Sequence, residues 1–368
     1  MHHIGLTASN TAWSAAPLTR SWIRQLYDTT DQSTPHNNHN NNNNNNHNLR
    51  SLSRTAPPRC CSYRGVACGE NFDEGDYRRV ISINIPDLKL KGQLPSEIGN
   101  FGSLSKLVIG INSLSGTIPS EIGSLSALQY LDMGYNALTG TIPSIIGTLK
   151  SLKVLLLFDN SLYGSIPSTI GGLQSLSIMY FNMNVLTGTI PHTIGSMTSL
   201  HVISLFKNKL SGIIPDSIGE LSSLKNIYLD FNSLEGTLPS SLTQLSALHH
   251  ILISHNRFIG KIPESIGELG SLNSIDMSFN SLTGTIPHSI SSLVDLNLLN
   301  LKSNFLTMGA MRGIHYTFFA PNTQRGQIDL SRNCLTFSSP VKPTQNTRGR
   351  HCLPGAEMYM AMARQEVG

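Results

Sequence analysis

Residues 272–293 read Leu-Asn-Ser-Ile-Asp-Met-Ser-Phe-Asn-Ser-Leu-Thr-Gly-Thr-Ile-Pro-His-Ser-Ile-Ser-Ser-Leu, and this pattern recurs along most of the chain. Ile275 and Met277 alternate with polar residues, which predicts a short half-buried strand that ends at Asn280. Gly284 suits a tight backbone, and Pro287 keeps its segment out of a central strand. A short helical piece is expected at residues 289–293, leading into the next unit.

The pattern repeats with a constant period of 24 residues. Proline keeps this period from Pro95 to Pro287, and glycine keeps it from Gly92 to Gly284. Asparagine keeps it at the end of each predicted strand, at Asn112, Asn136, Asn160, Asn184, Asn208, Asn232, Asn256, Asn280 and Asn304. A fixed period of this length predicts a solenoid, in which each unit stacks on its neighbours.

The nine asparagines are predicted to have a structural role. A buried Asn amide donates and accepts hydrogen bonds at once. Stacked at one position, these side chains would form a ladder that satisfies backbone groups of their own turn and the next. Because one unit cannot bury enough apolar surface to fold alone, the turns are expected to fold as an array.

The repeat Leu-x-x-Leu-x-Leu-x-x-Asn-x-Leu-x-Gly-x-Ile-Pro-x-x-Ile-Gly-x-Leu resembles the plant-type leucine-rich repeat. That class occurs in receptor-like kinase ectodomains, receptor-like proteins and polygalacturonase inhibitors, and the resemblance covers residues 78–337. It implies an α/β fold, a right-handed solenoid of about 10–11 turns. A parallel β-sheet would line the concave face, with short 3₁₀ or second-sheet segments on the convex side.

The regions outside the repeat are predicted to differ from it. Residues 1–58 contain an asparagine-rich tract that has nothing to bury and is expected to be disordered, with a cap-helix remnant at 21–31. Residues 59–77 form a cysteine-containing N-terminal cap, and residues 338–368 form a C-terminal cap and tail. The stretch from Cys61 to Cys68 resembles the family motif Cys-x-Trp-x-Gly-Val-x-Cys, with Tyr63 in place of Trp.

The resemblance implies two disulfides, Cys61–Cys68 and Cys334–Cys352. Cys60 is left over, and three alternatives stay open for it: competition for Cys68, a free thiol, or a disulfide between chains. Disulfides favour an extracellular or cell-surface location. Residues 1–7 lack the basic and apolar regions of a signal peptide, and no Asn-x-Ser/Thr glycosylation acceptor occurs, so the cytoplasm stays an alternative. No apolar run reaches the roughly 18 residues that span a bilayer.

Composition narrows the function classes. The net charge is +4 and only 13% of the residues are charged, without a basic stripe, so nucleic acid is not an expected partner. The chain contains no His-Glu-x-x-His, Gly-x-Ser-x-Gly, P-loop or kinase motif. The sequence therefore predicts a protein that is not an enzyme and that needs no metal or cofactor.

Candidate binding residues lie one, two, four and six positions before each ladder Asn, where side chains should face the concave side. They form a predicted band of Tyr130, Tyr135, Leu156, Phe158, Tyr180, Phe206, Tyr228, Phe231, His255 and Phe279. Exposed apolar patches mark partner sites, and Tyr and Phe are suitable anchors. Alternatively, the rings stack along the sheet and stabilise neighbouring turns.

His250 and His255, with Asp230 and Asp276 on neighbouring turns, leave open a pH-sensitive or metal-assisted contact or a solvated surface. The leading hypothesis is a recognition module that binds a protein or peptide ligand on the concave face, with a signalling co-receptor as a candidate second partner. Two alternatives stay open. One is a polygalacturonase-inhibitor-like protein, for which Lys207 and Lys302 would supply basic character, and the other is an intracellular or cell-wall scaffold.

Overall fold

The computed structural model describes residues 63–72, 78–307 and 327–333 of the 368-residue chain. The predicted disordered region 1–58, residues 59–62 and 73–77 of the N-terminal cap and the C-terminal region 338–368 lie outside the described residues, as do Cys60, Cys61, Cys334 and Cys352. These predictions therefore stay predictions.

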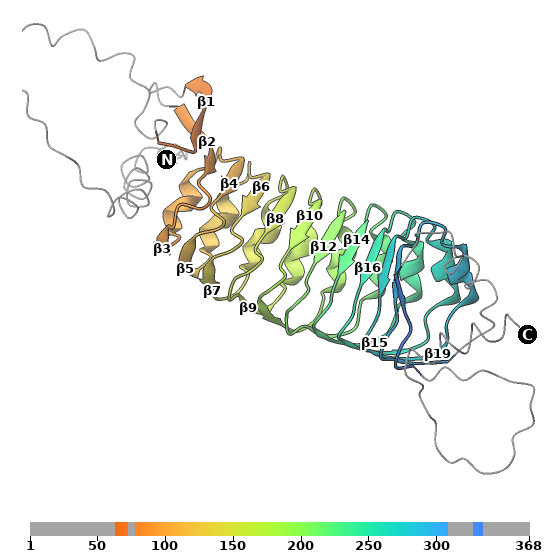
Figure 1. The fold of residues 1–368 in the computed structure, drawn as a ribbon. Coiled ribbons are helices and arrows are strands. Elements are labelled where there is room, and N and C mark those ends of the chain that lie inside the picture. The colour runs from red at the N-terminus through yellow and green to blue at the C-terminus, as the bar shows by residue number, and fades with distance from the viewer. Residues whose placement is uncertain (1–62, 73–77, 308–326, 334–368) are drawn as a thin grey trace, which may run out of the picture.

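The described residues form the solenoid that the repeat predicts (Figure 1). Its main feature is a twelve-stranded sheet in which β1 pairs with β2 antiparallel and all later neighbours pair parallel, which confirms the predicted parallel sheet. The strands are β1 (Val66–Phe72), β2 (Arg78–Asn84), β4 (Lys106–Val108), β6 (Tyr130–Asp132), β8 (Val154–Leu156), β10 (Ile178–Tyr180), β12 (Val202–Ser204), β14 (Asn226–Tyr228), β16 (His250–Leu252), β18 (Ser274–Asp276), β20 (Leu298–Asn300) and β22 (Gln327–Asp329).

A second set of strands lies along another edge of the solenoid, where Figure 1 labels β3, β5, β7, β9, β15 and β19. These strands form parallel sheets of three, two and five strands. They are β3 (Lys91–Gln93), β5 (Ser113–Thr117), β7 (Ala137–Thr139), β9 (Tyr163–Ser165), β11 (Val185–Thr187), β13 (Ser211–Gly212), β15 (Ser233–Thr237), β17 (Arg257–Gly260), β19 (Ser281–Thr285) and β21 (Phe305–Thr307). We call this set the hydroxyl-side strands, because serine and threonine are frequent on it.

Short 3₁₀ helices close each turn, and each follows the repeated proline. They are η2 (Ser96–Asn100), η3 (Ser120–Ser124), η4 (Ser144–Thr148), η5 (Ser168–Gly172), η6 (His192–Ser196), η7 (Asp216–Glu220), η8 (Ser240–Gln244), η9 (Glu264–Glu268) and η10 (His288–Ser292). The helical piece predicted at 289–293 is η10, one residue earlier. Nothing helical in the described ranges has the length and apolar character to cross a bilayer.

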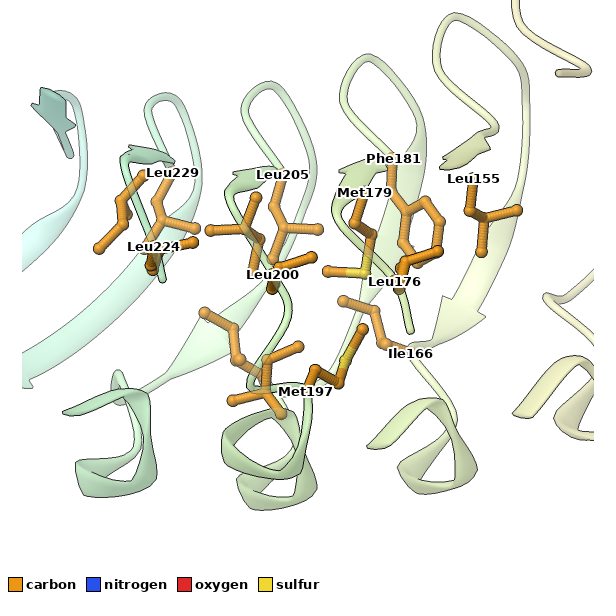
Figure 2. Packing of buried hydrophobic residues seen from close by; sticks show 14 of the residues in the cluster. Leu155, Ile166, Leu176, Met179, Phe181, Met197, Leu200, Leu205, Leu224 and Leu229 are labelled. Atoms are coloured by element: carbon orange, nitrogen blue, oxygen red, sulfur yellow. The ribbon is translucent and has the colours of Figure 1, made fainter. Parts of the chain in front are cut away.

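The core is continuous from Val66 to Leu330, so each turn buries its apolar residues against the turns on either side. Figure 2 shows part of this core, with Leu155, Met179 and Leu205 pointing inward from the strands. Phe181 is fully buried at a position where neighbouring turns carry leucine. Because every turn shares its core with the next, the stability of one turn depends on its neighbours.

The asparagine ladder links successive turns through backbone hydrogen bonds. The Oδ1 atom of Asn208 accepts a bond of 3.0 Å from the Leu186 N–H. Its Nδ2 donates bonds of 3.0 Å to the carbonyl oxygens of Phe181 and Leu205. The same arrangement recurs from Asn112 to Asn333. The inter-turn bonds reach the preceding turn, whereas the sequence led us to expect the following one.

The N-terminal end of the core is covered by part of the predicted cap. Tyr63 and Cys68 pack against the core. Cys68 is disulfide-bonded, and every other cysteine lies outside the described residues, so the pairing with Cys61 is still a prediction. Tyr63, which replaces the family's Trp, therefore keeps an aromatic ring at this end of the solenoid.

Candidate functional site

The residue before each ladder Asn has a left-handed backbone, with φ between 51° and 56°. We call these nine residues the edge column, because each follows the end of a strand of the twelve-stranded sheet. They are Ile111, Tyr135, Asp159, Met183, Lys207, Phe231, His255, Phe279 and Ser303. This conformation strains side chains other than those of Gly, Asn and Asp, by about 1–2 kcal/mol per residue.

Several bulky members of the edge column are open to solvent. The exposed fraction is 54% for Ile111, 49% for Tyr135, 47% for Phe231 and 37% for Phe279. Of the nine residues, only Asp159 is of a type that tolerates the left-handed backbone well. Neither the backbone conformation nor burial therefore explains these large apolar side chains.

The twelve-stranded sheet has one face toward the core and one face away from it, and we call the second the outer face; the sequence analysis predicted it as the concave face. The remaining predicted binding residues lie on this outer face or just after its strands. All of them are half-buried, namely Tyr130, Leu156, Phe158, Tyr180, Phe206, Tyr228 and His255. The parallel register places Leu156 beside Tyr180 and Ser204 beside Tyr228. Their neighbours in sequence are buried, so the strands alternate between the core and the outer face.

The first aromatic cluster lies over β6 to β10. The ring centroids of Tyr135 and Phe158 are 4.9 Å apart with an edge-on geometry, and those of Phe158 and Tyr180 are 6.3 Å apart. Gly134 leaves space for this cluster, because a Cβ atom there would lie 2.5 Å from Cε1 of Phe158. The glycine thus lets the Phe158 ring lie over the preceding turn.

The second cluster is a stack at the edge column. The rings of Phe231 and His255 are 4.1 Å apart and those of His255 and Phe279 are 4.3 Å apart, with interplanar angles of 15° and 23°. Phe206 follows β12, on the turn between the two clusters, and has no ring partner among the described residues. Six of the predicted residues therefore form two clusters, one edge-on and one stacked, with Phe206 between them. Tyr228 stacks instead on the ring of His250, at a centroid distance of 6.4 Å.

Asp230, a carboxylate of the outer face, is held by neutral donors. Asp230 Oδ1 accepts 2.9 Å bonds from the backbone N–H and from Oγ of Ser254. Burial raises the pKa of Asp230, and the charge of Asp276 adds to this effect. Burial also raises the pKa of Asp132. The pKa of Tyr228 is raised by burial first and then by the charges of Tyr180 and Asp230. Desolvation therefore affects ionisable groups at several points of this face.

Asp329, near the C-terminal end of the described solenoid, has the opposite shift. Burial raises the pKa of its carboxyl, but hydrogen bonds from Ser331 and the nearby Lys302 outweigh burial and lower the pKa. The Nζ atom of Lys302 lies 3.2 Å from Oδ2 of Asp329. This basic residue, expected to give the face basic character, is thus paired with an acid.

The metal-assisted contact at His250 and His255 gains no support. Within the described ranges, no group of three or more His, Cys, Asp or Glu residues is placed to hold a metal ion. His255 instead lies between two phenyl rings, with Nδ1 3.2 Å from Oγ of Ser254. Burial, followed by the charge of His249, lowers the pKa of His250.

A groove of about 600 Å³ runs along the edge column near its N-terminal end. It is lined by Asp87, Lys89, Ile111, Asn112, Ser113, Tyr135, Asn136, Ala137 and Asp159. Sequence analysis selected Tyr135 but not Ile111. Both residues occupy the position before a ladder Asn, which the sequence identifies, but the sequence does not show how exposed each occupant is: Ile111 and Tyr135 are exposed, whereas Met183 and Ser303 are half-buried.

Comparison with known proteins identifies the family. The family described as a leucine-rich repeat region matches residues 109–302. The chain is a leucine-rich-repeat protein. This confirms the resemblance drawn from the repeat, and no curated protein matches the chain.

Solved structures similar to this leucine-rich-repeat protein include plant receptor ectodomains. One is the Arabidopsis receptor kinase HAESA in complex with the peptide hormone IDA and the co-receptor SERK1, with 26% identity, a TM-score of 0.65, and coverage of 88% of this chain and 54% of that chain. Another is the ectodomain of GASSHO1/SCHENGEN3 from Arabidopsis thaliana with CASPARIAN STRIP INTEGRITY FACTOR 2, with 33% identity, a TM-score of 0.63, and coverage of 75% and 35%.

A third similar structure is a plant ice-binding protein, with 28% identity and a TM-score of 0.52. This match covers 62% of the leucine-rich-repeat protein and 80% of the ice-binding chain. The protein thus spans about half or less of the two receptor chains, but most of the ice-binding chain.

Proposed function

We propose that this leucine-rich-repeat protein is a recognition module without catalytic activity, and that it binds a peptide or protein on the outer face of the twelve-stranded sheet and its edge column. The similar receptor ectodomains support this proposal, because the HAESA and GASSHO1/SCHENGEN3 structures are complexes with a peptide hormone and with CASPARIAN STRIP INTEGRITY FACTOR 2. A co-receptor is a further proposed partner, since the HAESA complex also contains SERK1.

The edge column carries the proposal. Ile111, Tyr135, Phe231 and Phe279 place large apolar side chains in solvent on a backbone that disfavours them. Strained residues that burial does not explain point to a functional role. Four such residues along one edge, beside half-buried rings, give an extended ligand anchors on successive turns.

The test is selection from a displayed library of random twelve-residue peptides. The protein is immobilised in wild-type form and as the double variant Phe206→Ala/Phe231→Ala. We expect the wild type to enrich a set of related peptides and the variant to lose this enrichment. Thermal stability should change little, because Phe206 is half-buried and Phe231 is 47% exposed.

The matched control is Tyr163→Ala/Ile213→Ala, which removes side chains that are 54% and 57% exposed on the hydroxyl side. This control should enrich the same peptides as the wild type. Equal enrichment by the Phe206/Phe231 variant would move the site away from the outer face. If no peptide is enriched by the wild type, peptide recognition itself fails.

An extracellular or cell-surface location is proposed together with this function. Cys68 is disulfide-bonded, which suits an oxidising compartment, and the similar GASSHO1/SCHENGEN3 structure is the ectodomain of a plant membrane receptor kinase. Mass-shift alkylation of native protein tests this point. We expect Cys68 to be alkylated only after a reductant has broken its disulfide. Alkylation of Cys68 without reductant would support the cytoplasmic alternative.

A second candidate function is binding to ice, supported by the similarity to the plant ice-binding protein. From Ser113 to Thr189 the hydroxyl-side strands and the residues next to them carry exposed hydroxyls at Thr117, Thr139, Thr141, Ser165, Thr187 and Thr189. Thr117 pairs with Thr139 and Ser165 with Thr187 on neighbouring strands. Strands repeat at about 4.8 Å, which spaces these hydroxyls regularly.

Inhibition of ice recrystallisation tests the second candidate. We expect the wild type and Phe206→Ala/Phe231→Ala to inhibit equally, and we expect Thr139→Lys/Thr187→Lys to lose inhibition because two charges interrupt the array. A wild-type protein without any effect on ice growth would exclude this function.

A further inference from the structure

The outer face of the twelve-stranded sheet divides into two chemically different parts. Over β8 to β12 the strand positions that face outward are mainly apolar, and they include Val154, Leu156, Ile178, Tyr180 and Val202. Over β14 to β18 the same face carries two half-buried carboxylates, Asp230 and Asp276, beside the outward side chains of Tyr228, His250 and Leu252. A ligand that follows the array therefore meets an apolar surface first and a surface that contains two carboxylates next.

These two carboxylates are fixed in position. Asp230 is held by Ser254 on the next turn, through two 2.9 Å bonds to Oδ1. Oδ1 of Asp276 accepts from the N–H and Oγ of Ser278 at 2.9 and 2.6 Å, and Oδ2 accepts from Nδ2 of Asn300 at 3.0 Å. Both side chains are thus pre-organised, so a ligand group need not order them on binding.

No protein cation balances these charges within the described part of the chain. In residues 63–72, 78–307 and 327–333 the ion pair found is Lys302–Asp329. Lys207, exposed on the edge column one turn before Asp230, forms no ion pair with it. All donors to Asp230 and Asp276 are neutral, so a cationic ligand group would supply the missing complementary charge.

Aromatic rings flank the carboxylates. Phe231 directly follows Asp230, and it is stacked with His255 and Phe279 along the edge column. Cations bind favourably to aromatic faces, and a planar guanidinium does so while it donates to a carboxylate. The protein already shows such a contact elsewhere on this face, where Nζ of Lys106 lies 5.3 Å from the Tyr130 ring centroid.

We propose that the ligand of this face is an extended peptide with an apolar segment over β8 to β12 and a basic residue, preferably arginine, between Asp230 and Asp276. This inference rests on the proposed function and specifies its ligand. Register places Tyr228, Leu252 and Asp276 on three adjacent strands. From β10 to β16 there are three strand intervals of about 4.8 Å, so the basic residue should follow the apolar centre by about four residues of extended chain.

The test repeats the random twelve-residue peptide selection with two charge-matched variants. Asp230→Asn/Asp276→Asn keeps the size of both side chains and an oxygen acceptor for each serine. The control is Asp216→Asn/Asp295→Asn, which removes two exposed carboxylates that do not lie on the outer face. We expect the wild type and the control to enrich peptides with Arg or Lys about four residues from an apolar pair. The Asp230/Asp276 variant should enrich apolar peptides without the basic residue.

One enriched peptide is then synthesised with Arg or with Gln at the basic position and titrated against each protein. The Arg peptide should bind the wild type and the control equally, and bind Asp230→Asn/Asp276→Asn about 10–100-fold more weakly, as expected for a lost charge-assisted bond. The Gln peptide should bind all three proteins with similar weak affinity. Enriched peptides without basic residues, or equal binding of the Arg peptide to all three proteins, would overturn the inference and leave the proposed function standing. Absence of any enrichment would overturn both.

Discussion

Replacing Asn208 by alanine removes one rung of the asparagine ladder in the middle of the array. The Leu186 N–H loses its acceptor, because the Asn208 Oδ1 is the partner found for it. The carbonyl oxygens of Phe181 and Leu205 each lose one of two donors, since they also accept from Asn184 and Asn232. The change therefore leaves one buried N–H without a partner and weakens two carbonyl sites.

The magnitude follows from these contacts. Leu186 and Phe181 are fully buried, so water does not replace the lost partner without opening the turn. A buried unsatisfied N–H costs about 1–3 kcal/mol, and each further lost bond adds about 0.5–1.5 kcal/mol. We expect Asn208→Ala to lower the free energy of unfolding by about 2–6 kcal/mol.

Urea denaturation followed by circular dichroism measures this loss. The control is Asn226→Ala, because the Asn226 side chain on β14 is half-buried and makes no hydrogen bond within the described residues. That variant should stay within about 0.5 kcal/mol of the wild type. An unchanged midpoint for Asn208→Ala, or equal losses for the two variants, would refute the ladder as the source of inter-turn stability.

Further predictions concern charge and packing. The pKa of Asp230 is raised in the fold, so the protonated carboxyl stabilises the fold at low pH, and this stabilisation is lost as the pH rises above about 4. Asp230→Asn should reduce this loss of stability, as measured by urea denaturation at pH values from about 3.5 to about 6. Asp329 has a lowered pKa and acts with the opposite sign, so Asp329→Asn should reduce the loss of stability on acidification. Gly147→Ala should cost about 1–3 kcal/mol by calorimetry, because a Cβ there would overlap a backbone carbonyl of the next turn, whereas Gly102→Ala meets open space and should be nearly neutral.

The fold was predictable because its determinants are local and periodic. The apolar alternation of one unit marks the strand, and the repeated proline marks the start of each 3₁₀ helix. The glycine column from Gly92 to Gly284 has φ between 74° and 99°, as expected for residues that meet a tight backbone requirement. Each signal was strengthened by recurrence, since nine copies agree on the same position.

Features that depend on contact between turns were not predictable from one unit. Gly147 has no unusual φ, and its reason is the proximity of the next turn, which periodicity does not reveal. The direction of the ladder bonds likewise depends on how far each turn is offset from the preceding one. Ile111 belongs to a column that the sequence predicts to face the concave side, but it was not among the predicted binding residues; its left-handed backbone and its exposed fraction of 54% became apparent only in the structure.

The candidate binding residues were predictable only as a set of positions. Sequence placed Tyr135, Phe158 and Tyr180 on one face, but their grouping depends on Gly134, which gives the Phe158 ring room. The stack of Phe231, His255 and Phe279 depends on the edge-column backbone. Such arrangements follow from tertiary geometry, and the identity of a ligand depends in turn on them.

The central claim is that the outer face of the twelve-stranded sheet and its edge column bind the ligand. It is tested most directly by cross-linking an enriched peptide that carries a photoreactive phenylalanine in its apolar segment, followed by mass spectrometry of the wild-type protein. We predict cross-links to strand and edge-column residues between Tyr130 and Phe279, concentrated near Tyr180 and Phe206. Cross-links on the hydroxyl-side strands or on the 3₁₀ helices, without any on this face, would contradict the claim.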